Sequence, residues 1–142
     1  MSELKRTILY QAHLDAGATM VDFGGWDMPI QYPDGIVAEH LYCRSHCAIF
    51  DVSHMGRIDV EGPDQVAFLQ HVLSSNVLAL DLNQAQYCII PDKNGYAIDD
   101  AYLYRFEEGK YFLVINAGNI DKDWAHLMNE AKNFDVKLTN VS

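Results

Sequence analysis

The strand that decides the fold of this chain reads YAIDDAYLYRF over residues 96–106. Side chains of a β-strand point alternately to the two faces of the sheet. One face therefore carries Tyr96, Ile98, Asp100, Tyr102, Tyr104 and Phe106, and the other carries Ala97, Asp99, Ala101, Leu103 and Arg105. A carboxylate removed from water is costly unless a partner satisfies it. The pattern predicts a hydrogen-bonding ligand for Asp100, and a flat ring system with N–H groups would also stack on the aromatic side chains.

The adjacent acids Asp99 and Asp100 allow two interpretations. They are either solvent-exposed acids beside a turn, or one of them faces a ligand as a general base or as an acceptor for a substrate N–H. Alternation alone does not decide which acid faces the core. The aromatic neighbours favour Asp100 as the ligand-facing residue.

Outward from this strand, the pattern from residue 57 predicts β-α-β-β-β-α-β. The expected strands are 57–61, 87–90, 96–106, 111–116 and 134–138. One expected helix begins after Gly62-Pro63-Asp64, and the other is capped by Asn119 or Asp121 and runs to about residue 132. Such an order predicts an α+β fold in which helices cover one side of an antiparallel or mixed sheet. Upstream, residues 36–47 are expected to be helical, and residues 8–35 are expected to be irregular.

Composition narrows the class of protein. The 142 residues amount to about one domain, and their hydrophobic content of 49% is enough for a core. A net charge of −10 argues against nucleic acid and anionic membranes as partners. No secretory signal or membrane-spanning run is recognisable. Three cysteines form no disulfide framework, so a reducing cytoplasm, or a mitochondrial matrix in a eukaryote, is expected.

Three other motifs have structural explanations that outweigh the functional ones. Ser53 and His54 adjoin Asp51, but members of a catalytic triad come from distant segments. Cys43 and Cys47 lack the tight spacing of a zinc site, so no metal is expected. The segment FGGW at residues 23–26 has no phosphate-loop spacing and indicates a tight turn.

Five blocks, in order, resemble one family. They are MVDFGGWDMP (20–29), AEH through FDVSHMG (38–56), AQY (85–87), NGYAIDD (94–100) and VINA with NIDKDW (114–124). Together they are similar to the N-terminal part of the glycine-cleavage T protein, the aminomethyltransferase of the glycine cleavage system. The resemblance runs nearly from end to end, which makes it far more specific than any single motif.

The resemblance implies a reaction and a set of residues. Members of the family transfer a one-carbon unit from an aminomethyl group on a lipoylated carrier (H) protein to tetrahydrofolate, with release of ammonia and without a metal. Asp100 corresponds to the acid that accepts a hydrogen bond from folate N10–H, and it is the predicted catalytic residue. The predicted folate-binding residues are Met55, Tyr87, Asp100, Tyr104, Val114 and Asn116.

The resemblance also implies that residues 1–142 form the folate-binding N-terminal region without the C-terminal barrel domain. In the family, a pterin-binding glutamate and arginines for the folate tail come from the part missing here, so this chain would supply one wall of the pocket. Alternatives remain open: a non-catalytic or split-enzyme fragment that needs a separate C-terminal segment or self-association, or a folate-dependent demethylase relative.

Overall fold

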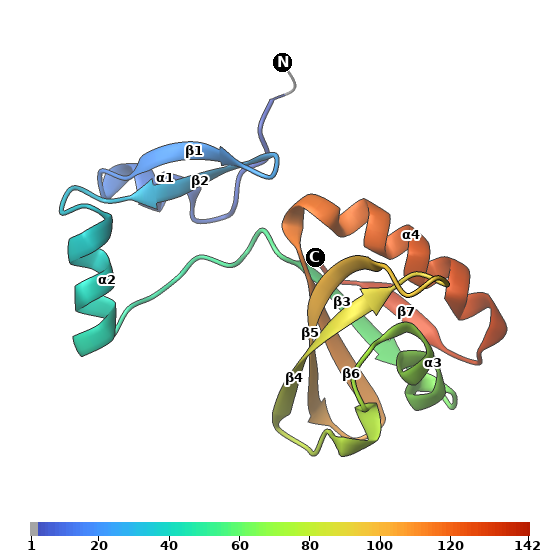
Figure 1. The fold of residues 1–142 in the computed structure, drawn as a ribbon. Coiled ribbons are helices and arrows are strands. Elements are labelled where there is room, and N and C mark those ends of the chain that lie inside the picture. The colour runs from blue at the N-terminus through green and yellow to red at the C-terminus, as the bar shows by residue number, and fades with distance from the viewer. Residues whose placement is uncertain (1–2) are drawn as a thin grey trace. The chain divides into compact units, whose positions relative to one another are not determined.

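The computed structural model describes residues 3–142. The chain forms two compact units, Met1–His54 and Met55–Ser142, which are described separately. Figure 1 shows the elements of both units.

The first unit contains a two-stranded antiparallel sheet flanked in the sequence by two helices. Its elements are α1 (Tyr10–Asp15), β1 (Thr19–Phe23), β2 (Trp26–Gln31) and α2 (Ile36–Ser45). Gly24 and Gly25 form the β1–β2 turn with positive φ angles of 59° and 87°, and Gly25 N–H donates to the Asp22 carboxylate. The expectation that residues 8–35 are irregular was wrong, because these turn residues close a hairpin. The predicted helix after residue 35 is confirmed.

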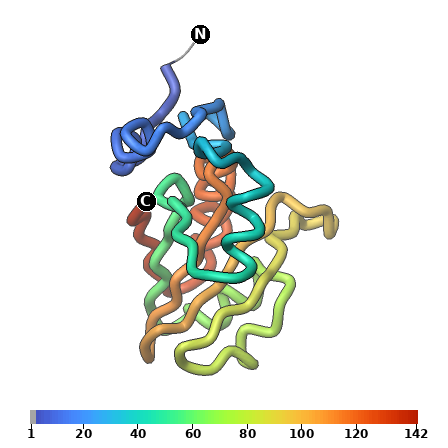
Figure 2. Tube along the Cα trace, turned by 90° about the vertical axis from the view of Figure 1, so that its left-hand side faces the viewer, coloured from blue at the N-terminus to red at the C-terminus, as the bar shows by residue number. Residues whose placement is uncertain are grey.

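The second unit is a five-stranded antiparallel sheet with two α-helices. Its elements are β3 (Gly56–Glu61), α3 (Gln65–Val72), a 3-10 helix (Val77–Ala79), β4 (Gln84–Pro91), β5 (Ala97–Glu107), β6 (Lys110–Ile115), a 3-10 helix (Ala117–Asn119), α4 (Ile120–Glu130), a 3-10 helix (Ala131–Asn133) and β7 (Lys137–Asn140). The strand order is β4-β5-β6-β3-β7, and every neighbouring pair is antiparallel. The tube in Figure 2 shows these strands running alongside one another. The predicted α+β order is confirmed.

The core of this unit lies between one face of the sheet and the two helices. Leu103 on β5 and Leu113 on β6 are fully buried there, as are Phe68 on α3 and Leu127 on α4. Both helices therefore cover the same face, as the alternation and the helical spacing predicted. The opposite face of β4, β5 and β6 has no helix over it within this unit.

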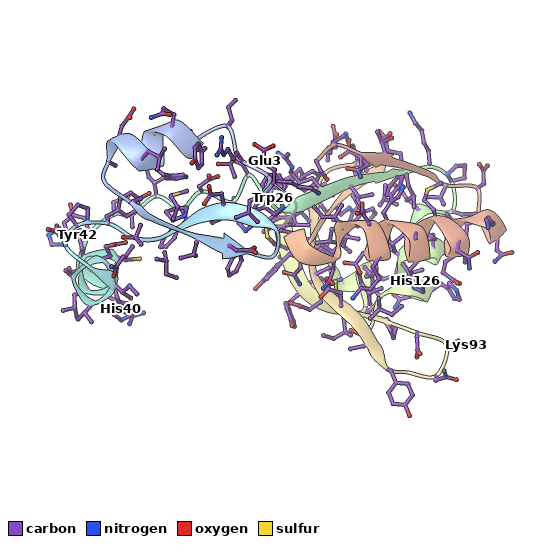
Figure 3. The ribbon with its side chains drawn as sticks, turned by 90° about the horizontal axis from the view of Figure 1, so that it is seen from above. Glu3, Trp26, His40, Tyr42, Lys93 and His126 are labelled. Atoms are coloured by element: carbon purple, nitrogen blue, oxygen red, sulfur yellow. The ribbon has the colours of Figure 1, made fainter. Side chains whose placement is uncertain are left out.

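Local hydrogen bonds fix the element ends around β5. The β4–β5 turn at Asp92–Gly95 has a positive φ of 85° at Gly95, and the Asp92 carboxylate accepts from the N–H groups of Asn94 and Tyr96. Figure 3 shows Lys93 on this turn and His126 on α4. Asn119 precedes α4 as expected, although its side chain makes no capping hydrogen bond. The last strand begins at Lys137 rather than 134, because residues 131–133 form a 3-10 turn.

Candidate functional site

The face of the sheet opposite the helices carries most of the predicted site residues. Directly paired residues of antiparallel strands point to the same face, and the register pairs Tyr102 with both Tyr87 and Val114. Tyr104 pairs with Phe112 in the next row. We call this surface the aromatic face, and its members are Tyr87, Asp100, Tyr102, Tyr104, Phe106, Phe112 and Val114.

The aromatic face is packed within itself but open to solvent. The ring centroids of Tyr87 and Tyr102 are 5.5 Å apart, and those of Tyr104 and Phe106 are 5.3 Å apart in a stacked pair. Tyr87, Tyr102 and Phe106 nevertheless remain 53%, 47% and 58% exposed. Half-exposed, mutually braced rings form a surface on which a flat ligand can stack.

Asn116, at the end of β6, holds the acid of this face in place. Its side-chain amide donates to Asp100 Oδ1 at 2.9 Å and to Asp99 Oδ1 at 3.0 Å. An ionised carboxylate has about four acceptor positions, so Asp100 keeps capacity for a ligand N–H. Hydrogen bonding to Asp100 raises the pKa of the Tyr87 phenol above its ordinary value, and burial and the charge of Asp100 add to this effect.

Met55 lies directly before β3 and is partly buried. Because Gly56 pairs with Ile115, the antiparallel register brings Met55 opposite Asn116 at the same end of the sheet. The structure of this unit thus gathers all six predicted site residues, Met55, Tyr87, Asp100, Tyr104, Val114 and Asn116, on one face or at its edge. Their role as a folate site stays a prediction.

Behind Asp100, on the helix side, lies an acid that the sequence reasoning missed. Asp123 on α4 is completely buried, and burial together with the neighbouring Asp99 carboxyl raises its pKa from 3.8 to about 7. Burial opposes ionisation of Asp99, but the Asp123 carboxyl and the Asn116 amide outweigh it and lower the pKa of Asp99. One signal was available: Asp123 shares a helical face with Ile120 and Leu127 at spacings of three and four residues.

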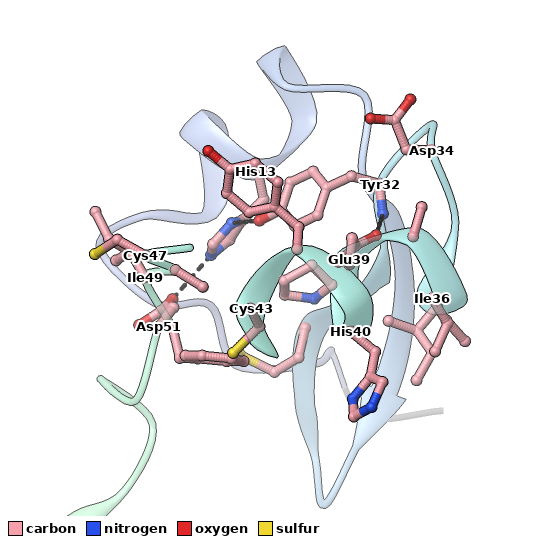
Figure 4. A pocket seen from close by; sticks show the side chains of 17 residues that line it. His13, Tyr32, Asp34, Ile36, Glu39, His40, Cys43, Cys47, Ile49 and Asp51 are labelled. Atoms are coloured by element: carbon pink, nitrogen blue, oxygen red, sulfur yellow. Dashed lines mark hydrogen bonds and ion pairs between the residues drawn. The ribbon is translucent and has the colours of Figure 1, made fainter. Parts of the chain in front are cut away.

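The first unit contains a second polar cluster, shown in Figure 4. His13 Nε2 lies 2.9 Å from Asp51 Oδ2, and His13 Nδ1 lies 2.8 Å from the Tyr32 hydroxyl. Burial opposes the charge on Asp51, but hydrogen bonds from His13, Ser53 and Thr7 outweigh it and hold the pKa of Asp51 well below its usual range. The histidine that bonds to Asp51 is therefore His13 on α1, which is 38 residues away, and not His54, which is close in the sequence.

This cluster borders a cavity of about 780 Å³ within the first unit. The cavity is lined by residues of β2, α2 and the segment 47–51, among them Glu39, His40 and Cys43. Within residues 3–142, no three His, Cys, Asp or Glu side chains are arranged to hold a metal ion, and the three cysteines are free. In that same range, no helix has the length and apolar character needed to cross a membrane.

The geometry of the second unit defines a class: an α+β module that presents a carboxylate within a solvent-open aromatic face. Comparison with known proteins identifies the family. The GCVT N-terminal domain family matches residues 9–142. The chain belongs to this family, that of the aminomethyltransferases of the glycine cleavage system.

The relatives are similar along nearly the whole chain. An aminomethyltransferase of Deinococcus deserti is 52% identical over 139 residues, which cover 98% of this chain and 39% of that protein. One of Thermus thermophilus is 48% identical, with 98% and 40% covered. The crystal structure of glycine cleavage system aminomethyltransferase T from Bartonella henselae superposes with a TM-score of 0.92 at 39% identity, covering 97% of this chain and 38% of that one. The chain thus spans about two fifths of the length of these relatives.

Proposed function

We propose that this chain supplies the folate-binding wall of a tetrahydrofolate-dependent aminomethyltransferase in the glycine cleavage system. The observation that carries the proposal is the Asp100 carboxylate, which is set in an aromatic face and oriented by the Asn116 amide at 2.9 Å. A pteridine with its amine N–H groups is the kind of flat, donor-bearing ring that such a surface suits. The family membership supports the same conclusion.

The residues of this site fit specific tasks in the proposal. Tetrahydrofolate supplies two nitrogen nucleophiles that take up the one-carbon unit. Asp100 accepts a hydrogen bond from N10–H, which orients this amine and increases electron density on its nitrogen. Tyr87, Tyr104 and Val114 provide the stacking and apolar surface, and Met55 and Asn116 bound it at one end.

The donor and the remaining parts of the pocket belong to the proposal as well. The aminomethyl group would arrive on the lipoyl arm of a carrier (H) protein, and ammonia would leave as the carbon is transferred. Because the relatives are about two and a half times as long, residues outside this chain would supply the opposite wall. Each missing charge-assisted hydrogen bond weakens binding by about 1.5–3 kcal/mol. We therefore expect the chain alone to bind tetrahydrofolate only weakly.

An NMR titration with tetrahydrofolate under reducing conditions tests this proposal. We expect shifts confined to Tyr87, Asp100, Tyr104 and Asn116, with a dissociation constant weaker than micromolar. Shifts elsewhere, or none on the aromatic face, would contradict the folate site. A micromolar or tighter constant by calorimetry would show that the pocket is complete without further chain. Mixing the chain with lipoylated carrier and tetrahydrofolate then distinguishes an enzyme from a binding fragment.

A further inference from the structure

Two carboxyl groups on facing elements lack donors for three of their four oxygens. Asp123 on α4 is completely buried, and neither of its oxygens has a hydrogen-bond donor among residues 3–142. Asp99 on β5 uses Oδ1 to accept from Asn116, while its buried Oδ2 has no donor either in that part of the chain. An ionised carboxylate buried without a partner is strongly destabilising. The two buried carboxyl groups are therefore stable together only when one of them is protonated.

One shared proton resolves this arrangement. Two like charges at one site oppose each other, so one of the two acids stays protonated. A neutral carboxyl on Asp123 becomes a donor to Asp99, which satisfies oxygens on both residues. The proton belongs on Asp123, because Asp99 is already stabilised as an anion by the Asn116 amide.

We propose that Asp123 is a positioning residue: as a neutral carboxylic acid it donates a hydrogen bond to Asp99, which holds Asn116 and thereby orients Asp100. The link is the single amide of Asn116, which donates to Asp99 and to Asp100 at 3.0 and 2.9 Å. The consequence for ligand binding rests on the proposed function, whereas the proton and the network do not.

The charged groups around Asp123 set its pH range. Asp99 faces it from β5, the charge of Asp100 on the other side of that strand also acts on it, and Lys122 neighbours it on α4 but donates to the Ile98 carbonyl at 2.8 Å. Burial and Asp99 raise the pKa of Asp123 to about 7. The folded chain therefore holds a proton that the unfolded chain has lost above pH 3.8. Its stability therefore falls progressively as the pH rises from 3.8 to about 7 and levels off above 7, where the coupled pair carries two charges.

Equilibrium unfolding in urea between pH 5 and 9 tests the proton. We expect the wild-type midpoint to fall from pH 5 to about 7 and to level off above it. Asp123→Asn keeps an N–H donor without a titrating group, so it should be at least as stable as the wild type at pH 6, and its midpoint should not fall between pH 5 and 7. Asp123→Ala should have a lower midpoint than Asp123→Asn throughout this range, because it leaves Asp99 Oδ2 without a donor. Asp121→Asn, an exposed acid on the same helix, should follow the wild type.

Two outcomes of this series would overturn the proposal. One is an Asp123→Asn midpoint as low as that of Asp123→Ala at pH 6, and the other is a wild-type midpoint that stays constant from pH 5 to 7. A measurement on the wild type alone covers the case in which the variants do not fold. Carbon-13 NMR of the aspartate carboxyls should show one that titrates with a midpoint near 7, and the absence of such a group would contradict the shared proton.

The positioning role has its own readout, the side-chain amide resonance of Asn116. It should shift with the same midpoint in the wild type and stay constant with pH in Asp123→Asn. An Asn116 resonance that does not change with pH in the wild type would show that Asp123 stabilises the fold without positioning Asn116. Tetrahydrofolate does not enter these measurements, so failure of the folate proposal and failure of this one are separable.

Discussion

The two faces of the five-stranded sheet differ although both carry large apolar side chains along β4, β5 and β6. The face toward α3 and α4 is closed, with Leu103 and Leu113 fully buried. The aromatic face repeats the same alternation with larger rings, yet nearly half of the Tyr102 surface stays exposed. An exposed apolar surface of this kind marks an interaction site. A strand with large apolar side chains on both faces therefore predicts that both faces are covered. In this unit α3 and α4 cover one face, and no helix of the unit covers the aromatic face.

The largest effect should come from truncating the closed face. Leu103→Ala should lower the free energy of unfolding by about 2–5 kcal/mol, because a fully packed site loses contacts and leaves a cavity. Tyr102→Ala, its neighbour on the aromatic face, should cost less than about 1 kcal/mol. Urea denaturation followed by circular dichroism measures both. Equal losses would show that the aromatic face is also covered in solution.

The adjacent acids Asp99 and Asp100 separate the faces by function. Asp100→Asn should weaken tetrahydrofolate binding about 10- to 100-fold, because a hydrogen bond to a charged acceptor contributes about 1.5–3 kcal/mol. Its unfolding midpoint should stay close to that of the wild type. Asp99→Asn should act mainly on stability, because Asp99 points to the helix side. If Asp99→Asn instead abolished binding and Asp100→Asn did not, the assignment would reverse.

Adding bulk should also distinguish the faces. A Cβ on Gly56 would come within 2.5 Å of Ile115 Cγ1 and 2.8 Å of Ile120 Cγ1, so Gly56→Ala should cost about 1–3 kcal/mol through overpacking. Ala85→Val adds more volume on β4, but on the open side and at an exposed position, and should change stability by less than about 0.5 kcal/mol. Thermal unfolding compares the two, and a neutral Gly56→Ala would mean that the closed face is loosely packed.

Polar substitutions on the aromatic face should act on association rather than on stability. The double variant Tyr102→Ser and Phe106→Ser should reduce self-association and the binding of an apolar dye. Leu78→Ser, an exposed residue outside this face, serves as the control and should change neither. Sedimentation velocity and dye fluorescence measure the two effects. A wild-type chain that is monomeric at high concentration and binds no dye would show that this face attracts no partner.

Much of the second unit was predictable because its signals are local. Period-two alternation located β5, the Asn-Gly turn located the β4–β5 hairpin, and helical spacing located α3 and α4. The first unit was harder to predict. Its hairpin depends on paired glycines at positive φ, and its polar cluster joins Asp51 to His13, which are far apart in the sequence. No local pattern links Asp51 to His13, because the contact forms only when α1 meets the segment around residue 51.

The sequence by itself determined the element order of the second unit, the family and the pairing of an acid with an aromatic strand face, because alternation, turn chemistry and ordered motifs are properties of neighbouring residues. Only the tertiary structure decided which acid lies on which side of the sheet and that Asn116 joins both. It also showed that Asp123 meets Asp99. These contacts arise when α4 docks on β5 and β6, and the desolvation that shifts the pKa of a carboxyl exists only once the core has closed around it.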